Sequence, residues 1–112
     1  MLARKYRITQ SEFKRFIRKS RVRKNDIFFI KYCPNHKNYS QFSIVVSLKV
    51  SKLATKRNRF KRLISSWIQE DINILPKGLY IVIYLNKPIN KTDKKTKKDI
   101  LIRLLSSLKC LY

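Results

Sequence analysis

The chain has 112 residues, and its 28 lysines and arginines outnumber 6 acidic residues to give a formal net charge of +22. Hydrophobic residues make up 44% of the sequence, which excludes a disordered basic tail, because such a tail lacks the apolar side chains of a core. A compact chain of this length has a radius of gyration of about 13 Å, so its positive charges repel one another unless a polyanion neutralises them. We therefore expect a single domain, residues 1–112, that binds nucleic acid.

The sequence shows no feature of secretion or membrane insertion. Cys33 and Cys110 are its only cysteines, and no secretory leader opens the chain. The apolar run 79–85 is about a third of the roughly 20 residues that span a bilayer. We expect a cytoplasmic protein with no membrane partner.

The first expected element is a helix that begins at Thr9. Thr9 and Glu12 have the spacing of a capping box, in which the Thr9 hydroxyl accepts a hydrogen bond from the Glu12 amide and the Glu12 carboxylate accepts one from the Thr9 amide. The apolar side chains that follow repeat at helical spacing: Phe13, Phe16 and Ile17. The basic stretch 18–24 is expected to end this helix near residue 19.

Two segments alternate with a period of two, as β-strands do. The first is 26–33, in which aromatic and β-branched side chains occupy one face. The side chains of its second face are Phe29, Lys31 and Cys33. Residues 34–38 have the composition of a turn, and residues 42–48 then resume the alternation. We interpret the two strands as a hairpin.

Three more elements follow in the second half of the chain. The period changes to 3.6 between residues 54 and 71, which predicts the longest helix. Its apolar face carries Phe60, Leu63, Ile64, Trp67 and Ile68. Residues 79–85 form an almost unbroken apolar run, typical of a strand buried on both faces of a sheet. A last helix is expected from about residue 92 to about residue 110.

These elements predict an α+β fold, a single-domain α/β sandwich with a central mixed sheet. The expected order is α-β-β-(β)-α-β-α, in which the strand in brackets is optional. Residues 42–48 and 79–85 are expected to form a parallel βαβ unit through the long helix, because parallel strands need such a crossover.

Side chains suited to catalysis are scarce. One histidine and six scattered acids form no Ser/His/Asp set and no adjacent carboxylate pair, and there is no glycine-rich phosphate loop. Cys33 and His36 have possible metal-ligand spacing, but a zinc site needs three or four ligands and only the distant Cys110 is left to help. We therefore expect no catalytic residue and no metal site. Cys33 is then a small buried side chain and His36 an exposed loop residue.

The densest positive charge lies in residues 49–62. No acidic residue occurs between Asp26 and Glu70, whereas solvated helix faces usually carry acids among their lysines. Arg62 lies opposite Phe60 on a helical wheel, so the helix has an apolar face and a basic face. Guanidinium groups can hold two phosphate oxygens at once, and the helix N-terminus adds a partial positive charge. The pattern favours phosphate binding over the alternative of a solvated basic face.

This segment resembles the protein subunit of bacterial ribonuclease P. Residues 46–50, Val-Ser-Leu-Lys-Val, are similar to a strand of that family, and residues 57–64, Arg-Asn-Arg-Phe-Lys-Arg-Leu-Ile, are similar to its Arg-Asn-Arg-x-Lys-Arg helix. A Phe-containing first helix and a late buried strand occur in the family's order, so the resemblance covers nearly the whole chain. Leu48, Ser51 and Ser65 stand where the family often has Lys, Gly and Arg.

The resemblance implies a left-handed βαβ crossover, against the usual right-handed rule, and two RNA-binding regions. The residues that would face the catalytic RNA are Arg57, Asn58, Arg59, Lys61 and Arg62, and the basic residues expected to join them are Lys49, Lys52 and Lys56. A cleft between the first helix and the sheet would hold the single-stranded 5′ leader of precursor tRNA through Phe13, Ile17, Phe29 and Lys31. Aromatic faces stack on unpaired bases while lysines contact phosphates. Alternatively, Phe13 and Phe16 close the core.

The resemblance also implies the role of an enzyme subunit. In the ribonuclease P holoenzyme, the RNA subunit binds Mg²⁺ and cuts precursor tRNA to free its mature 5′ end. The protein would bind no cofactor and no small-molecule substrate. Its charges would lessen the repulsion between two polyanions and let the RNA's metal sites fill at lower magnesium.

Other classes of protein share some of these features. A ribosomal or other general RNA-binding protein would have a similar charge, size and fold, and is the main alternative. A membrane-active cationic protein would need an exposed amphipathic helix, but the leucines of the last helix are better explained as core. A helix-turn-helix DNA-binding protein is disfavoured, because no second helix precedes the basic one.

Overall fold

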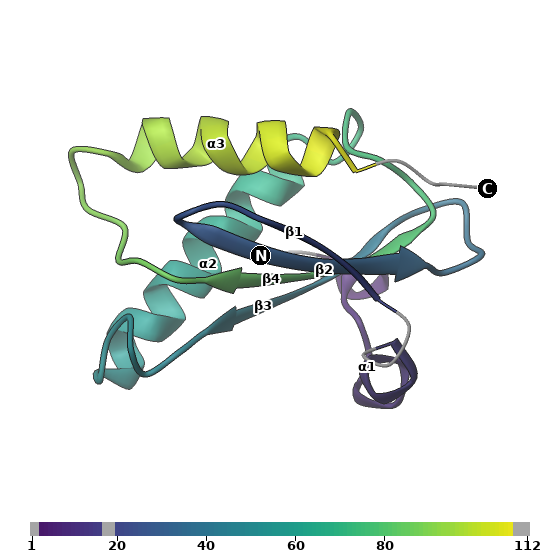
Figure 1. Ribbon diagram of the computed structural model, residues 1–112, viewed down its shortest axis with the longest axis horizontal. Coiled ribbons are helices and arrows are strands. Elements are labelled where there is room, and N and C mark those ends of the chain that lie inside the picture. The colour runs from purple at the N-terminus through teal and green to yellow at the C-terminus, as the bar shows by residue number, and fades with distance from the viewer. Residues whose placement is uncertain (1–2, 17–19, 109–112) are drawn as a thin grey trace.

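A four-stranded sheet lies at the centre of the molecule, with its strands in the order β1-β2-β4-β3 (Figure 1). The strands are β1 (Arg21–Lys24), β2 (Phe28–Pro34), β3 (Gln41–Val46) and β4 (Leu79–Leu85). The sheet is mixed, because β2 is antiparallel to β1 and β4, whereas β3 is parallel to β4. The computed structural model describes residues 3–16 and 20–108.

The helices lie on both sides of this sheet, with α3 above it and α1 below it in the view of Figure 1. They are the short 3-10 helix η1 (Arg4–Tyr6), α1 (Gln10–Phe16), α2 (Ala54–Glu70) and α3 (Lys94–Ser106). The radius of gyration is 13.3 Å, close to that expected for a compact chain of this length. The predicted α+β class and mixed sheet are confirmed.

Local sequence signals explain where several elements begin. The capping box forms as predicted: the Thr9 amide donates to Glu12 Oε1 at 3.1 Å, and the Glu12 amide donates to Thr9 Oγ1 at 3.2 Å. At the start of β2, Asn25 Oδ1 accepts from the amides of Ile27 and Phe28 and so forms the turn that follows β1. Both signals act between residues two or three positions apart, so they can be recognised in the sequence alone.

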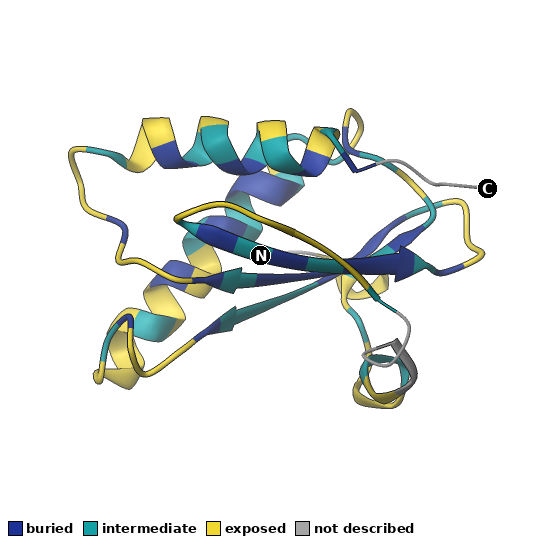
Figure 2. Cartoon of the chain, in the orientation of Figure 1, coloured by how far each residue is buried: buried dark blue, intermediate teal, exposed yellow. Residues whose placement is uncertain are grey.

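The main core lies on the inner face of the sheet, the face covered by α2 and α3. The sheet contributes side chains at alternate positions, including Ile30, Ile81 and Ile83, which are fully buried. The helical side chains buried in this core are Phe60, Ile64, Trp67 and Ile68 of α2 and Leu101 and Leu105 of α3. In Figure 2 the buried residues lie along the central strands and on the side of α3 that faces the sheet. Burial of each large apolar side chain stabilises the fold by about 1.5–3 kcal/mol.

The predicted hairpin of 26–33 with 42–48 is wrong. β4 lies between β2 and β3, and its Ile81 pairs with Tyr32 on one side and Phe42 on the other. β4 is the most apolar strand, and its central position satisfies both of its edges with hydrogen bonds. Its inner face is buried, whereas Tyr80 and Tyr84 on its outer face are half-buried. β3 and β4 do form the predicted parallel βαβ unit through α2, and its handedness stays an expectation of the resemblance.

Strand β1 was expected only as a basic stretch that ends the first helix. All four of its residues are exposed, so it has no apolar alternation for a sequence pattern to detect. It forms by antiparallel pairing with β2, from Arg21 opposite Tyr32 to Lys24 opposite Phe29. β1 is thus the additional strand that the predicted order gave in brackets. It precedes β2 and β3, whereas the predicted order placed it after them. None of the helices in the described part of the chain has the length and apolar character needed to cross a membrane.

Candidate nucleic-acid interface

The outer face of the sheet points away from α2 and α3 and is only partly covered. Side chains opposite each other in an antiparallel pair share a face, so the register places Phe29 beside Tyr84 and Lys31 beside Val82 on this face. Cys33 lies beside Tyr80 in the next row. The predicted alternation of this strand between two faces is therefore confirmed.

Two aromatic rings and one lysine form what we name the aromatic corner: Phe29, Tyr84 and Lys31. The Phe29 and Tyr84 rings meet edge to face, with centroids 5.6 Å apart. Lys31 Nζ lies 5.9 Å from the Phe29 ring centroid and 5.8 Å from that of Tyr84, within cation–π range. Burial raises the pKa of Tyr84, so its hydroxyl stays neutral. Half-buried rings beside a cation suit an unpaired base and its phosphate.

Tyr84 was missed by the sequence analysis, because residues 79–85 read as a strand buried on both faces. The usable signal was the alternation within that run, in which Tyr80 and Tyr84 share one face with Val82. Only the pairing of β2 with β4 brings Tyr84 to Phe29.

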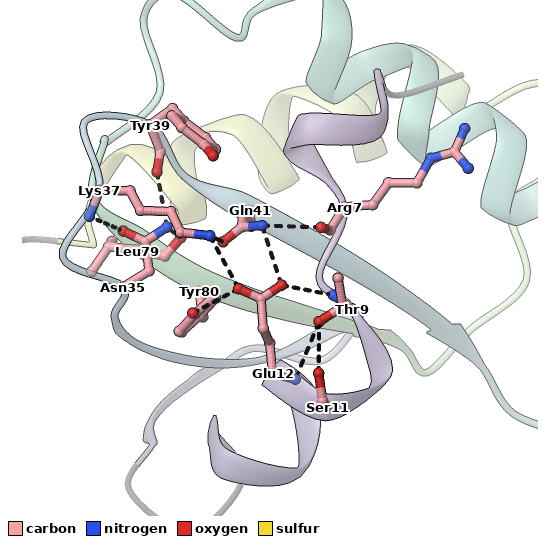
Figure 3. Close-up of polar contacts among 10 residues, drawn as sticks. All are labelled: Arg7, Thr9, Ser11, Glu12, Asn35, Lys37, Tyr39, Gln41, Leu79 and Tyr80. Carbon is pink, nitrogen blue, oxygen red and sulfur yellow. Dashed lines mark hydrogen bonds and ion pairs between the residues drawn. The ribbon is translucent and has the colours of Figure 1, made fainter.

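Helix α1 lies against one end of the outer face, and the Glu12 carboxylate holds it there (Figure 3). Tyr80 Oη donates to Glu12 Oε2 at 2.8 Å, and Lys37 Nζ contacts the same oxygen at 3.1 Å. The Gln41 amide nitrogen donates to Glu12 Oε1 at 3.5 Å and to the Arg7 carbonyl oxygen at 3.1 Å. One acidic side chain thus joins the first helix to β3, β4 and the loop after β2.

This network changes the acidity of Glu12. Burial alone would raise its pKa, but hydrogen bonds from Thr9, Tyr80 and Lys37 stabilise the carboxylate and lower the pKa from 4.5 to about 2. Glu12 is therefore ionised throughout the physiological range, and its negative charge is already engaged by protein groups.

Phe13 follows Glu12 and is half-buried against Cys33 and Val82. The structure therefore brings Phe13 to the same face as Phe29 and Lys31, as the resemblance implies, while part of its surface serves packing. Ile17, the fourth residue of the expected leader cleft, lies outside the described residues.

The structure also places the two residues considered as metal ligands. Cys33 is buried, which raises the pKa of its thiol to about 11, and His36 is exposed in the loop after β2 with φ 59°. Within residues 3–16 and 20–108, no three His, Cys, Asp or Glu side chains gather as a metal site requires.

The second cationic surface is formed by α2 and the connector before it, residues 47–53. Its exposed members are Lys49, Lys52, Lys56, Asn58, Arg59, Lys61 and Arg62. Arg57 differs, because it is half-buried and its Nη1 donates to the Ser51 carbonyl oxygen at 2.9 Å, which ties the connector to the helix. The first turn of α2 carries no acid and Leu53 gives no side-chain cap, so the positive end of the helix dipole is not neutralised there.

The fold and these two surfaces have the charge and aromatic pattern of a small nucleic-acid-binding protein. The model of the Ribonuclease P family matches residues 2–109 of the sequence. The chain belongs to this family, whose work is tRNA processing, and the resemblance found in the sequence is confirmed.

Curated relatives and solved structures agree with this assignment. The Ribonuclease P protein component of Mesoplasma florum is 33% identical over 91 residues, which are 80% of this chain and 82% of the relative. That of Thermotoga maritima is 31% identical over 88 residues, 75% of this chain and 74% of the relative.

The fold is also that of solved ribonuclease P proteins. The Thermotoga maritima structure superposes with a TM-score of 0.77 at 24% identity, covering 92% of this chain and 97% of that one. The Staphylococcus aureus structure gives 0.72 at 20% identity, covering 100% of this chain and 98% of that one.

Proposed function

We propose that this chain acts as the protein subunit of ribonuclease P by contacting two RNAs at once. The connector 47–53 and the exposed face of α2 bind the catalytic RNA subunit. The aromatic corner, with Phe13, holds the 5′ leader of precursor tRNA. The observation that carries this proposal is that the two surfaces do not share a face: α2 packs on the inner face of the sheet, and the aromatic corner lies on the outer face.

The α2 surface suits a structured RNA. Its cations are exposed on a rigid helix, and arginine and asparagine can each make paired hydrogen bonds to phosphate or base edges. Phosphate contacts of this kind position a protein without reading sequence. We infer that Arg57 acts mainly through the connector, because its guanidinium is already engaged with Ser51.

The outer face of the sheet suits single-stranded RNA. Base stacking on an aromatic ring tolerates any base, as a subunit that processes many precursor tRNAs needs. Lys31 supplies a cation beside the rings for the backbone phosphate.

Catalysis in this proposal belongs to the RNA subunit and the Mg²⁺ that it binds. The side chains of the protein bind and orient the two RNAs. Their positive charge offsets the repulsion between two polyanions, so the RNA's own metal sites fill at lower magnesium.

The experiment is cleavage of a precursor tRNA by the matching RNA subunit at low magnesium and near-physiological salt. We expect cleavage to depend on the protein, and the triple variant Asn58→Ala, Lys61→Ala, Arg62→Ala to need at least about tenfold more protein, because each lost charged hydrogen bond costs about 1.5–3 kcal/mol. Arg57 is left intact so that the connector keeps its conformation.

The control is the double variant Lys95→Ala, Arg103→Ala, which also removes one lysine and one arginine, but from the exposed side of α3. If both variants lose activity equally, the effect is one of net charge and the assigned surface is wrong. If the wild-type chain binds RNA but does not change cleavage, a general or ribosomal RNA-binding role replaces the proposal.

A further inference from the structure

A cavity of about 570 Å³ lies between α2, the connector 47–53 and the loop 86–93. Its volume falls in the range of about 300–1,000 Å³ that small-molecule sites occupy. The α2 residues that line it include Lys56, Arg59, Leu63 and Ser66, which recur at three- and four-residue spacing and so form one stripe of the helix. This stripe is separate from the outward residues Asn58 and Lys61. The sequence analysis named Lys56 and Arg59 as RNA-binding residues but did not predict a cavity beside them.

The lining combines an apolar base with a cationic rim. The apolar residues are Val50, Phe60, Leu63 and Ile89, and the cations are Lys56, Arg59, Arg62, Lys91 and Lys94. No acidic side chain is among the described residues that line the cavity. A ligand that fits must therefore be negatively charged at one end and flat or apolar at the other.

The walls of the cavity are held in place by contacts of their own. On the loop side, Lys97 Nζ donates to the Pro88 carbonyl oxygen at 2.6 Å and pairs with Asp93 at 2.9 Å, and Ile89 is anchored in the main core. On the connector side, Arg57 holds the Ser51 carbonyl oxygen. A preformed cavity binds more tightly, because less conformational entropy is lost on binding.

We propose that this cavity receives one unpaired nucleotide of the RNA subunit. Its base packs against Phe60 and Leu63, and its phosphate pairs with rim cations such as Arg59 and Lys94. The occupant must be unpaired, because bases within an A-form helix are stacked and cannot offer a face to an apolar surface. This inference rests on the proposed function and adds a second mode of contact to it, insertion of a base.

The first test uses nuclear magnetic resonance of the labelled protein titrated with AMP, adenosine or inorganic phosphate. We expect AMP to shift the amide signals of Ser51, Ser66 and Lys91 at lower concentration than adenosine or phosphate does, because only AMP has both a base and a phosphate. Ser66→Leu fills the cavity without removing a charge and should weaken AMP binding by about tenfold or more. Ser106→Leu, on the exposed side of α3, is the matched control and should leave it unchanged.

The second test measures affinity for the RNA subunit at several salt concentrations. Ser66→Leu should lower affinity by about tenfold with the same salt slope, because no charge is lost. Lys94→Ala should lower affinity and also reduce the slope by about 0.7–0.9, the share of one phosphate contact. Thermal unfolding of both variants confirms that they are folded.

Two results would overturn the proposal. One is phosphate alone shifting the cavity signals as strongly as AMP, and the other is unchanged RNA affinity in Ser66→Leu. Failure of the proposed function is distinguishable from both, because it appears as precursor tRNA cleavage that is indifferent to the wild-type protein.

Discussion

The two faces of the sheet are stabilised by different kinds of interaction. On the inner face, Ile30 and Ile83 are fully buried beneath α2 and α3, and hydrophobic burial dominates. On the outer face, the small cluster around Cys33 and Val82 is supplemented by the polar contacts that Glu12 of α1 makes with Tyr80 and Lys37. The inner face keeps the chain folded, while the outer face leaves aromatic rings and a lysine half-buried and available to a ligand.

In the proposed function, this difference separates stability from binding along a single strand. Successive residues of β2 point to opposite faces, so the neighbours Ile30 and Lys31 have different surroundings: Ile30 is buried in the main core and Lys31 is half-buried on the outer face. The comparison can therefore be tested by substituting adjacent residues.

The largest expected effect is on the inner face. Ile30→Ala should lower the free energy of unfolding by about 2–5 kcal/mol, because it opens a cavity at a fully buried position. Lys31→Ala on the same strand should change it by about 0.5 kcal/mol or less. Urea unfolding followed by circular dichroism measures both, and comparable losses would contradict the division of the two faces.

The next effect concerns leader binding by the aromatic corner. Phe29→Ala should weaken binding of precursor tRNA to the holoenzyme by about 1–3 kcal/mol, the value of one stacked base, and should leave binding of mature tRNA unchanged. Phe29→Leu keeps apolar bulk but removes the ring, so stacking predicts that it resembles the alanine variant. Wild-type affinity for precursor tRNA in Phe29→Leu would show that the Phe29 ring serves packing within the protein and does not stack on a base.

An effect of comparable size is expected from the Glu12 network and should depend on pH. The pKa of Glu12 is lowered from 4.5 to about 2 in the folded chain, so its contribution is fully present above about pH 4.5 and is lost as the pH falls through about 2. Glu12→Gln should destabilise the protein by about 1–3 kcal/mol at neutral pH, with the difference from wild type shrinking in acid. A difference that is constant from neutral pH to pH 2 would rule out the ionised carboxylate as the cause.

The smallest effect uses Cys33 as a reporter of α1. Burial raises the pKa of the thiol from 9.0 to about 11, so thiolate is about a hundredfold scarcer than for a free thiol and alkylation should be slow. With Cys110→Ser to leave one thiol, Glu12→Gln should speed alkylation of Cys33 severalfold, because α1 covers it less often. Equal alkylation rates with and without Glu12→Gln would mean that Glu12 does not control docking of α1.

The elements that could be predicted from the sequence are those with a local cause. The capping box of Thr9 and Glu12 acts across one helical turn. The 3.6 period of α2 and the alternation of β2 record which side chains face the core, so both elements and the basic face of α2 were found before their partners were known.

The errors were made where the cause lies far along the chain. The hairpin was wrong because β4, more than thirty residues beyond β3, takes the place between β2 and β3. Strand β1 was missed because its exposed residues owe their conformation to hydrogen bonds with β2. Tyr84 joined the aromatic corner only through the register of β4 against β2.

The sequence by itself determined the charge, the helix and strand periods, and the motif of residues 57–62 that led to the ribonuclease P family. Only the tertiary structure decided which strands are neighbours, which rings meet Lys31, and that loop 86–93 closes a cavity over α2. The physical reason is that periodicity encodes how one segment divides between core and solvent, whereas the choice of partner minimises exposed apolar surface and unpaired backbone over the whole chain.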